Sequence, residues 1–181
     1  MRTALVVAAV ALAALGASAQ EAGVTETRVL LGQPAAFSGP SAGLGVEFWR
    51  GAHAAFEAFN ESGGVHGRRV ELALADDAYD AEKAAGAVRK LATEDRVFGL
   101  FGGVGTPTMV KALPVVLELY RKEGLFYFAN FTGAQAQREP PYDVAVFNVR
   151  ASYRHETETI VARLFGQGRR KVGIFVQDDA Y

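Results

Sequence analysis

Residues 101–108, FGGVGTPT, combine two kinds of group that bind small anions, glycine amides and threonine hydroxyls. They follow an apolar run and precede a segment with helical spacing, so Thr106 is expected to cap a helix that Pro107 opens. A Walker loop requires Gly-Lys-Ser/Thr and a dinucleotide loop requires G-x-G-x-x-G, and neither occurs here. The pattern suits a carboxylate better than a phosphate, with a ligand-free glycine turn as an equal alternative.

Two other loops carry similar groups. The segment 35–45, AAFSGPSAGLG, has Ser38, Ser41 and three glycines before a helical stretch. Residues 130–133, NFTG, again join a hydroxyl to a glycine. Ligands of open α/β sheets bind beyond the carboxyl ends of the strands, so three such loops together predict one wall of a binding pocket.

The side chains that catalysis or metal binding would need are not arranged for it. His53, His66 and His155 lack metal-ligand spacing, and the sequence contains no G-x-S-x-G motif and no cysteine. The pair Asp76-Asp77 is interpreted as helix capping, with one aspartate as the cap and the other near the positive helix end. The sequence therefore predicts a protein that is not an enzyme and that needs no metal or cofactor.

Alternating strand and helix signals must position these loops. The expected strands are 28–35, 69–75, 96–101, 125–130, 144–149 and 171–177, and the expected helices are 44–60, 81–91, 107–123 and 153–164. Pro114 should kink or split the third helix. No neighbouring strands are joined by a two-residue turn, so the fold class is α/β with a mostly parallel sheet.

Composition and the first residues indicate an exported protein. The chain has 181 residues, and its 19 Lys and Arg against 20 Asp and Glu exclude nucleic-acid binding through bulk charge. An apolar run ending in Ala17-Ser18-Ala19 predicts a cleavable signal peptide over 1–19, too short for a membrane span, before a polar leader, 20–27. Because no cysteine is available for a lipid anchor, we expect a free periplasmic protein and not a lipoprotein.

The last residues, QDDAY, follow the sixth expected strand and carry helix-capping aspartates where a crossover helix would begin. A sixth strand without that helix leaves one face of its sheet uncovered. We therefore expect this chain to be a fragment of a longer protein.

Several stretches resemble the leucine/isoleucine/valine-binding family of type I periplasmic substrate-binding proteins, the receptors of ABC transporters. They are residues 30–72, with F-S-G-P and N-E-S-G-G-V-H-G-R as their most specific pieces, then DDAYD (76–80), FGGVGTPT and NVRASY (148–153). The resemblance covers about 28–181 and implies two α/β lobes that close on a ligand. The resemblance implies that residues 28–147 form lobe one. Residues 148–181 would contain the first crossing and hinge, NVRASY, and the start of an incomplete lobe two.

The resemblance also implies a set of ligand-binding positions: Ser38, Leu44, Gly105, Thr106, Phe131, Thr132, Gly133 and Tyr153. The carboxylate of the ligand is expected against Gly105 and Thr106. Two departures from the family pattern bear on which ligand is bound. Val-Gly-Thr-Pro-Thr (104–108) replaces a serine-rich stretch, and Leu44 stands where an aromatic residue often lies.

The main hypothesis is a periplasmic receptor of an ABC importer that binds an amino acid, branched-chain ones included, or a related small carboxylate. Its partner would be the inner-membrane permease. The alternative is a ligand-sensing domain of a chemoreceptor, kinase or cyclase, and the remote alternative is a nucleotide-dependent α/β enzyme, which the missing phosphate fingerprint disfavours.

Overall fold

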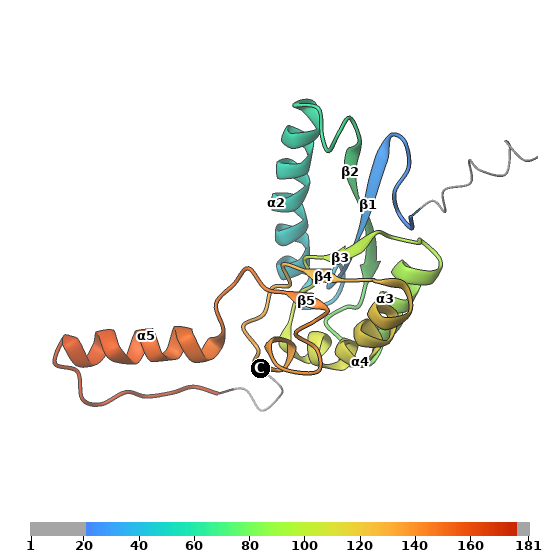
Figure 1. The fold of residues 1–181 in the computed structure, drawn as a ribbon. Helices are drawn as coiled ribbons and strands as arrows, with labels where there is room; N and C mark the ends of the chain where they lie inside the picture. Colours follow the sequence, from blue (N-terminus) through green and yellow to red (C-terminus); the bar gives the residue numbers. More distant parts are fainter. Residues whose placement is uncertain (1–20, 177–181) are drawn as a thin grey trace, which may run out of the picture.

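The computed structural model describes residues 21–176, so the predicted signal peptide and the final aspartates fall outside it. Within this range one parallel sheet has the strand order β2-β1-β3-β4-β5 (Figure 1). The strands are β1 (Arg28–Ala35), β2 (Arg69–Asp76), β3 (Gly99–Phe101), β4 (Tyr127–Phe128) and β5 (Val146–Phe147). The predicted α/β class and parallel sheet are confirmed. Because β1 lies between β2 and β3, the strand order reverses there, which is where such sheets bind ligands.

The helices are α2 (Ala42–Glu61), α3 (Ala81–Thr93), α4 (Thr106–Glu123) and α5 (Tyr153–Gly166), with a short 3-10 helix η1 (Ala136–Arg138). Asp80 caps α3 by accepting a hydrogen bond from the Glu82 amide at 2.9 Å. The capping role predicted for Asp76-Asp77 was therefore wrong. Pro114 lies inside α4, and the helix continues past it, so the expected split does not occur.

Helices cover the two faces of the sheet unequally. On one face, α3 and α4 pack against each other and enclose the hydrophobic core (Figure 1). The most deeply buried core residues are Val88, Leu91, Leu100, Leu113 and Val116. The crossover connections direct the carboxyl ends of β1 and β3 toward the amino ends of α2 and α4, which places the three loops at one edge of the sheet.

Phenylalanines line the opposite face, which α2 covers only in part. The ring centroids of Phe56 in α2 and Phe101 in β3 lie 5.2 Å apart, and Phe101 lies 6.3 Å from Phe128 in β4. Beyond them, Phe128 and Phe147 are 43% and 51% exposed. The sheet therefore presents an apolar surface over β4 and β5.

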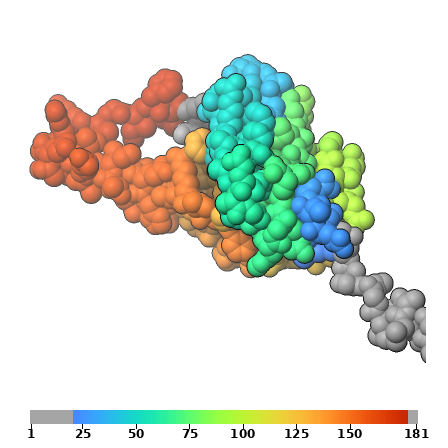
Figure 2. Space-filling model, turned by 90° about the horizontal axis from the view of Figure 1, so that it is seen from above, coloured from blue at the N-terminus to red at the C-terminus, as the bar shows by residue number. Residues whose placement is uncertain are grey.

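The segment after β5 extends away from the sheet, as the orange and red parts of Figures 1 and 2 show. Within residues 21–176, α5 is a helix with no buried side chain, and Ile160 and Phe165 are exposed. Residues 171–176 pair with no described strand, and Phe175 is fully exposed, so the sixth strand is not formed. An apolar sequence becomes a strand only when a neighbouring strand supplies backbone partners.

The strands β3, β4 and β5 are shorter than their apolar runs predicted. Arg96 has a φ of 50°, which places it in a turn and delays the start of β3. Ala129, with a φ of 55°, likewise ends β4 before Asn130. None of the helices within 21–176 has the length and apolar character needed to cross a lipid bilayer.

Candidate ligand-binding site

Three hydroxyl groups from distant parts of the chain meet at the carboxyl ends of β3 and β4. The oxygens of Thr106 and Thr132 lie 2.6 Å apart, and the hydroxyl of Tyr153 lies 3.5 Å from each of them. We call these three residues the hydroxyl cluster. Thr106 and Thr132 are buried and Tyr153 is half-buried, so Tyr153 is the member that reaches the surface.

Gly105 allows the chain to turn from β3 into α4. Its φ of 106° is strained for any residue with a side chain, and a Cβ there would lie 2.6 Å from the Tyr79 ring. Gly105 is the N-cap residue of α4 and Thr106 is the first helical residue, so the predicted capping role of Thr106 was wrong. Its hydroxyl bonds to Thr132 instead. Pro107 has no amide hydrogen and the amide of Met109 donates to the Gly105 carbonyl at 3.1 Å, so the first turn of α4 offers the amides of Thr106 and Thr108 next to the hydroxyl cluster.

Gly133 and Ser152 hold Tyr153 in place. The amide of Tyr153 donates to the carbonyl of Gly133 at 2.7 Å, and a Cβ on Gly133 would lie 2.6 Å from the Tyr153 ring. Ser152 is buried and caps α5 by accepting a hydrogen bond from the amide of His155 at 3.2 Å. The tyrosine is thereby fixed against the loop that follows β4.

Phe131 forms the exposed apolar part of the same wall. It is 43% exposed, and its ring stacks on that of Phe48 in α2 with centroids 5.7 Å apart. Its amide donates to the carbonyl of Gly103 at 2.6 Å, which ties the loop after β4 to the glycine loop after β3. A ligand at this wall would meet an aromatic ring next to polar groups, as is usual in small-molecule sites.

Ser38 and Leu44 lie in the neighbouring loop after β1. The amide of Ser38 donates to Asp76 Oδ1 at 3.2 Å, and its hydroxyl donates to Asp76 Oδ2. Leu44 is in the first turn of α2 and is 47% exposed. The hydrogen-bonding groups of Ser38 are thus bonded to Asp76, whereas the side chain of Leu44 is exposed enough to contact a ligand.

The pKa values of two adjacent aspartates at the end of β2 are shifted in opposite directions. Burial acts to raise the pKa of Asp76, but hydrogen bonds from Ser38 and from the amides of Phe37 and Ala78 outweigh it and lower that pKa. Burial raises the pKa of Asp77 to about 6, and the nearby charges of Asp76 and Asp80 add to this effect. The carboxyl group of Asp77 therefore carries a proton more readily than an ordinary aspartate.

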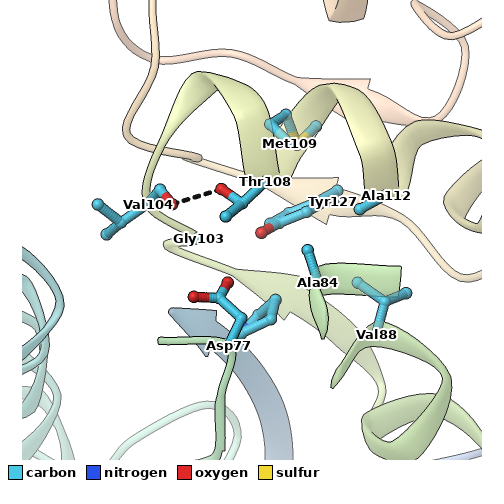
Figure 3. Close-up of a pocket in the computed structure, with 10 residues that line it drawn as sticks. Asp77, Ala84, Val88, Gly103, Val104, Thr108, Met109, Ala112 and Tyr127 are labelled. Carbon is cyan, nitrogen blue, oxygen red and sulfur yellow. Dashed lines mark hydrogen bonds between the residues drawn. The ribbon is translucent and has the colours of Figure 1, made fainter. Parts of the chain in front are cut away.

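A small cavity lies beneath the glycine loop, between Asp77 and Tyr127 (Figure 3). Its volume of about 10 Å³ is that of one water molecule at most. Burial raises the pKa of the Tyr127 phenol, as does the neighbouring Asp77 charge. Thr108 donates to the carbonyl of Val104 at 2.7 Å and so closes the loop above the cavity. This space is too small for a solute, so any ligand must bind at the exposed side of the loops.

The structure brings six of the eight predicted positions together and adds residues that the sequence did not single out. Gly105, Thr106, Thr132, Gly133 and Tyr153 meet, with Phe131 beside them, whereas Ser38 and Leu44 lie one loop away. Arg150 was overlooked: its guanidinium carbon lies 5.3 Å from the Phe131 ring centroid and 5.1 Å from that of Tyr153. The available signal was a single cation inside NVRASY, three residues before the tyrosine.

The parallel sheet and the loop cluster at its carboxyl edge define a type I periplasmic binding fold. A family model described as periplasmic binding protein matches residues 28–181, and the chain belongs to that family. Within it, the chain is similar in sequence to homologues of Leu/Ile/Val-binding proteins. The family consists of solute-binding proteins and not of enzymes.

Individual relatives agree with this assignment. Leu/Ile/Val-binding protein homolog 7 of Brucella abortus is 37% identical over 106 residues, which cover 58% of this chain and 26% of the relative. An amino acid binding protein of Pseudomonas aeruginosa is 29% identical over 97 residues, covering 54% of this chain and 25% of the relative. A solved structure from Rhodopirellula baltica, of a possible leucine/isoleucine/valine-binding protein, superposes with a TM-score of 0.76 at 32% identity. That superposition covers 86% of this chain and 41% of the other, so this chain matches less than half the length of these relatives.

Proposed function

We propose that this protein is the solute-binding component of an ABC importer and that it binds an amino acid or a related small carboxylate. The observation that carries the proposal is the hydroxyl cluster, in which Thr106, Thr132 and Tyr153 meet beside the first turn of α4. A helix amino end with hydroxyl groups is suited to a carboxylate, because the amides and hydroxyls donate hydrogen bonds and the helix dipole favours negative charge.

The names of the relatives support the ligand class. The Pseudomonas protein is named an amino acid binding protein, and the Brucella protein is named a homologue of a Leu/Ile/Val-binding protein. The exposed ring of Phe131 and the side chain of Leu44 offer apolar contacts of the kind an aliphatic or aromatic side chain would use. We therefore place branched-chain amino acids and small aromatic acids first among the candidates.

The same proposal includes location and partners. Family membership and the predicted signal peptide support a periplasmic protein whose ligand-bound form is recognised by an inner-membrane permease. Residues 28–147 would form lobe one, and NVRASY (148–153) would be the first crossing about which a second lobe closes on the ligand.

The test is calorimetric titration of the complete protein with L-leucine, L-isoleucine, L-valine and benzoate. At least one should bind, and Thr106→Ala should weaken that binding by about 1–3 kcal/mol, because a hydroxyl of the site is lost. Thr93→Ala is the matched control: Thr93 is an exposed threonine at the end of α3, bonded to the Arg89 carbonyl, and its loss should leave affinity unchanged. Wild-type protein that binds none of the four compounds would contradict the proposed ligand class.

A further inference from the structure

Arg150 lies at the outer side of the hydroxyl cluster and touches two of the proposed site residues. Its guanidinium carbon is 5.3 Å from the centroid of the Phe131 ring and 5.1 Å from that of Tyr153. These are distances at which a cation is attracted to an aromatic face. The tyrosine hydroxyl in turn lies 3.5 Å from the oxygens of Thr106 and Thr132. One tyrosine thus joins the guanidinium to the buried threonines.

The backbone around Arg150 is fixed from the other side. Arg138, the last residue of η1, donates from Nη2 to the carbonyl of Arg150 at 2.8 Å and to that of Ala151 at 3.3 Å. Its Nε donates to the carbonyl of Ala134 at 3.1 Å, so the crossing is tied to the loop after β4. The position of Arg150 relative to Phe131 and Tyr153 is therefore set by the fold.

Glu156, one turn into α5, holds the guanidinium group. Its two carboxylate oxygens accept hydrogen bonds from Nε at 2.9 Å and Nη2 at 3.0 Å. The side chains of Arg150 and Glu156 are 32% and 33% exposed, so solvent reaches part of the ion pair. A second carboxylate can approach the guanidinium there and compete with Glu156 for it, because planar guanidinium groups bind carboxylates through two parallel bonds.

The charges around the loops differ between the two sides of the candidate site. On the β2 side lie three acidic residues, Asp76, Asp77 and Asp80, and Tyr79 between them contacts Gly105. On the side of the crossing, Arg138 and Arg150 bring two positive charges against the single negative charge of Glu156. A ligand with one anionic group is thereby favoured in one orientation, with that group toward Arg150.

We propose that Arg150 is the residue that selects for a carboxylate in the ligand, and that Glu156 presents its guanidinium group and competes with the ligand for it. This inference rests on the proposed function and deepens it, because it names the side chain that distinguishes acids from their neutral analogues. The ligand carboxylate lies at the first turn of α4 beside the Tyr153 hydroxyl, and one of its oxygens faces the guanidinium group of Arg150.

The proposal predicts effects of opposite sign for the two partners of one ion pair. Arg150→Gln should weaken binding of L-isoleucine or benzoate to the complete protein by about 10- to 100-fold, because a close charge partner is removed. Glu156→Gln should leave that affinity unchanged or raise it, because the internal competitor loses its charge. A pair that only fastened α5 to the crossing would give the same loss from both variants.

Neutral analogues supply the second readout. L-isoleucinamide and benzamide should bind wild-type protein more weakly than the acids, and Arg150→Gln should remove most of that difference. Arg89→Gln, which breaks the comparable Arg89–Glu118 pair between α3 and α4, is the matched control and should change neither affinity. Equal loss of acid and amide binding in Arg150→Gln, or equal loss from Arg150→Gln and Glu156→Gln, would overturn the inference and leave the proposed function standing. Wild-type protein that binds none of the acids would overturn both.

Discussion

The side chain of Asn60 bonds both backbone groups of Val70. Its Oδ1 accepts from the Val70 amide at 2.7 Å, and its Nδ2 donates to the Val70 carbonyl at 2.9 Å. Because β2 is an edge strand of the described sheet, this one side chain satisfies backbone groups that a further strand would otherwise pair. It also fastens the end of α2 to the start of β2, which sets the position of the loops at the other end of both elements.

Replacing Asn60 with alanine should therefore destabilise the protein. We expect a loss of about 1–3 kcal/mol in the free energy of unfolding, because two buried backbone groups lose their partner. Urea unfolding of the complete protein measures this. Ser62→Ala is the control, since Ser62 is exposed and its hydroxyl donates to the Phe59 carbonyl of its own helix end. Equal stability of the two variants would contradict the role given to Asn60.

The hydroxyl of Tyr153 should contribute to ligand binding through the threonines beneath it. Tyr153→Phe keeps the ring that lies over Gly133 but loses the hydroxyl, so affinity for L-isoleucine should fall about tenfold or less, the usual effect of one hydrogen bond. Thr132→Val, which removes one of the supporting hydroxyls, should have a similar effect. Tyr120→Phe on α4 is the control. Unchanged calorimetric affinity in both site variants would show that the cluster is structural only.

Gly105 should tolerate no side chain. Its φ of 106° and the 2.6 Å approach of the Tyr79 ring to a Cβ predict a destabilisation of about 1–3 kcal/mol for Gly105→Ala, with loss of binding as α4 shifts. Gly43→Ala is a control of opposite sign, because Gly43 is helical and has open space around it, so alanine should stabilise α2. Thermal unfolding compares the two; a neutral Gly105→Ala would contradict the strain argument.

Much of the fold could be predicted from local patterns. The bounds of β1 follow from an apolar run that ends in turn residues, and α4 ends at Gly124, where the chain adopts the left-handed conformation expected of a glycine. One failure depended on partners distant in the sequence. The described part of the sixth expected strand, 171–176, has strand composition but no described strand to pair with. The end of β4 was missed for a local reason, the positive φ of Ala129.

The site was predictable in its loops but not in its contacts. Hydroxyl-rich segments after parallel strands indicated the edge of the sheet at which the hydroxyl cluster lies. The direction of a side chain, however, is decided by tertiary packing, which local patterns do not show. Thr106 was expected to cap a helix, but its hydroxyl bonds that of Thr132. The hydroxyl of Ser38 was expected to face the ligand, but it donates a hydrogen bond to Asp76. Arg150 escaped notice because its two ring contacts join residues 131 and 153, which no local pattern brings together.

The buried carboxyl group of Asp77 should make stability depend on pH in a direction opposite to that of Asp76. Because the pKa of Asp77 is raised to about 6 from its ordinary value of 3.8, the folded protein holds a proton that the unfolded chain releases between these values. Stability from this group is therefore present at low pH and is lost as pH rises through about 6, by at most about 3 kcal/mol.

Asp77→Asn should remove this dependence, since asparagine stays neutral and its Oδ1 can still accept the Tyr79 amide bond that Asp77 accepts at 2.8 Å. Relative to the wild type, the variant should be similar in stability near pH 4 and progressively more stable toward pH 7 in urea unfolding. Asp76→Asn should show the reverse, a deficit that is largest at neutral pH, because the lowered pKa of Asp76 gives stability that is lost on acidification. A constant difference between Asp77→Asn and wild type across this range would show that the carboxyl group is not perturbed by burial beneath the loop.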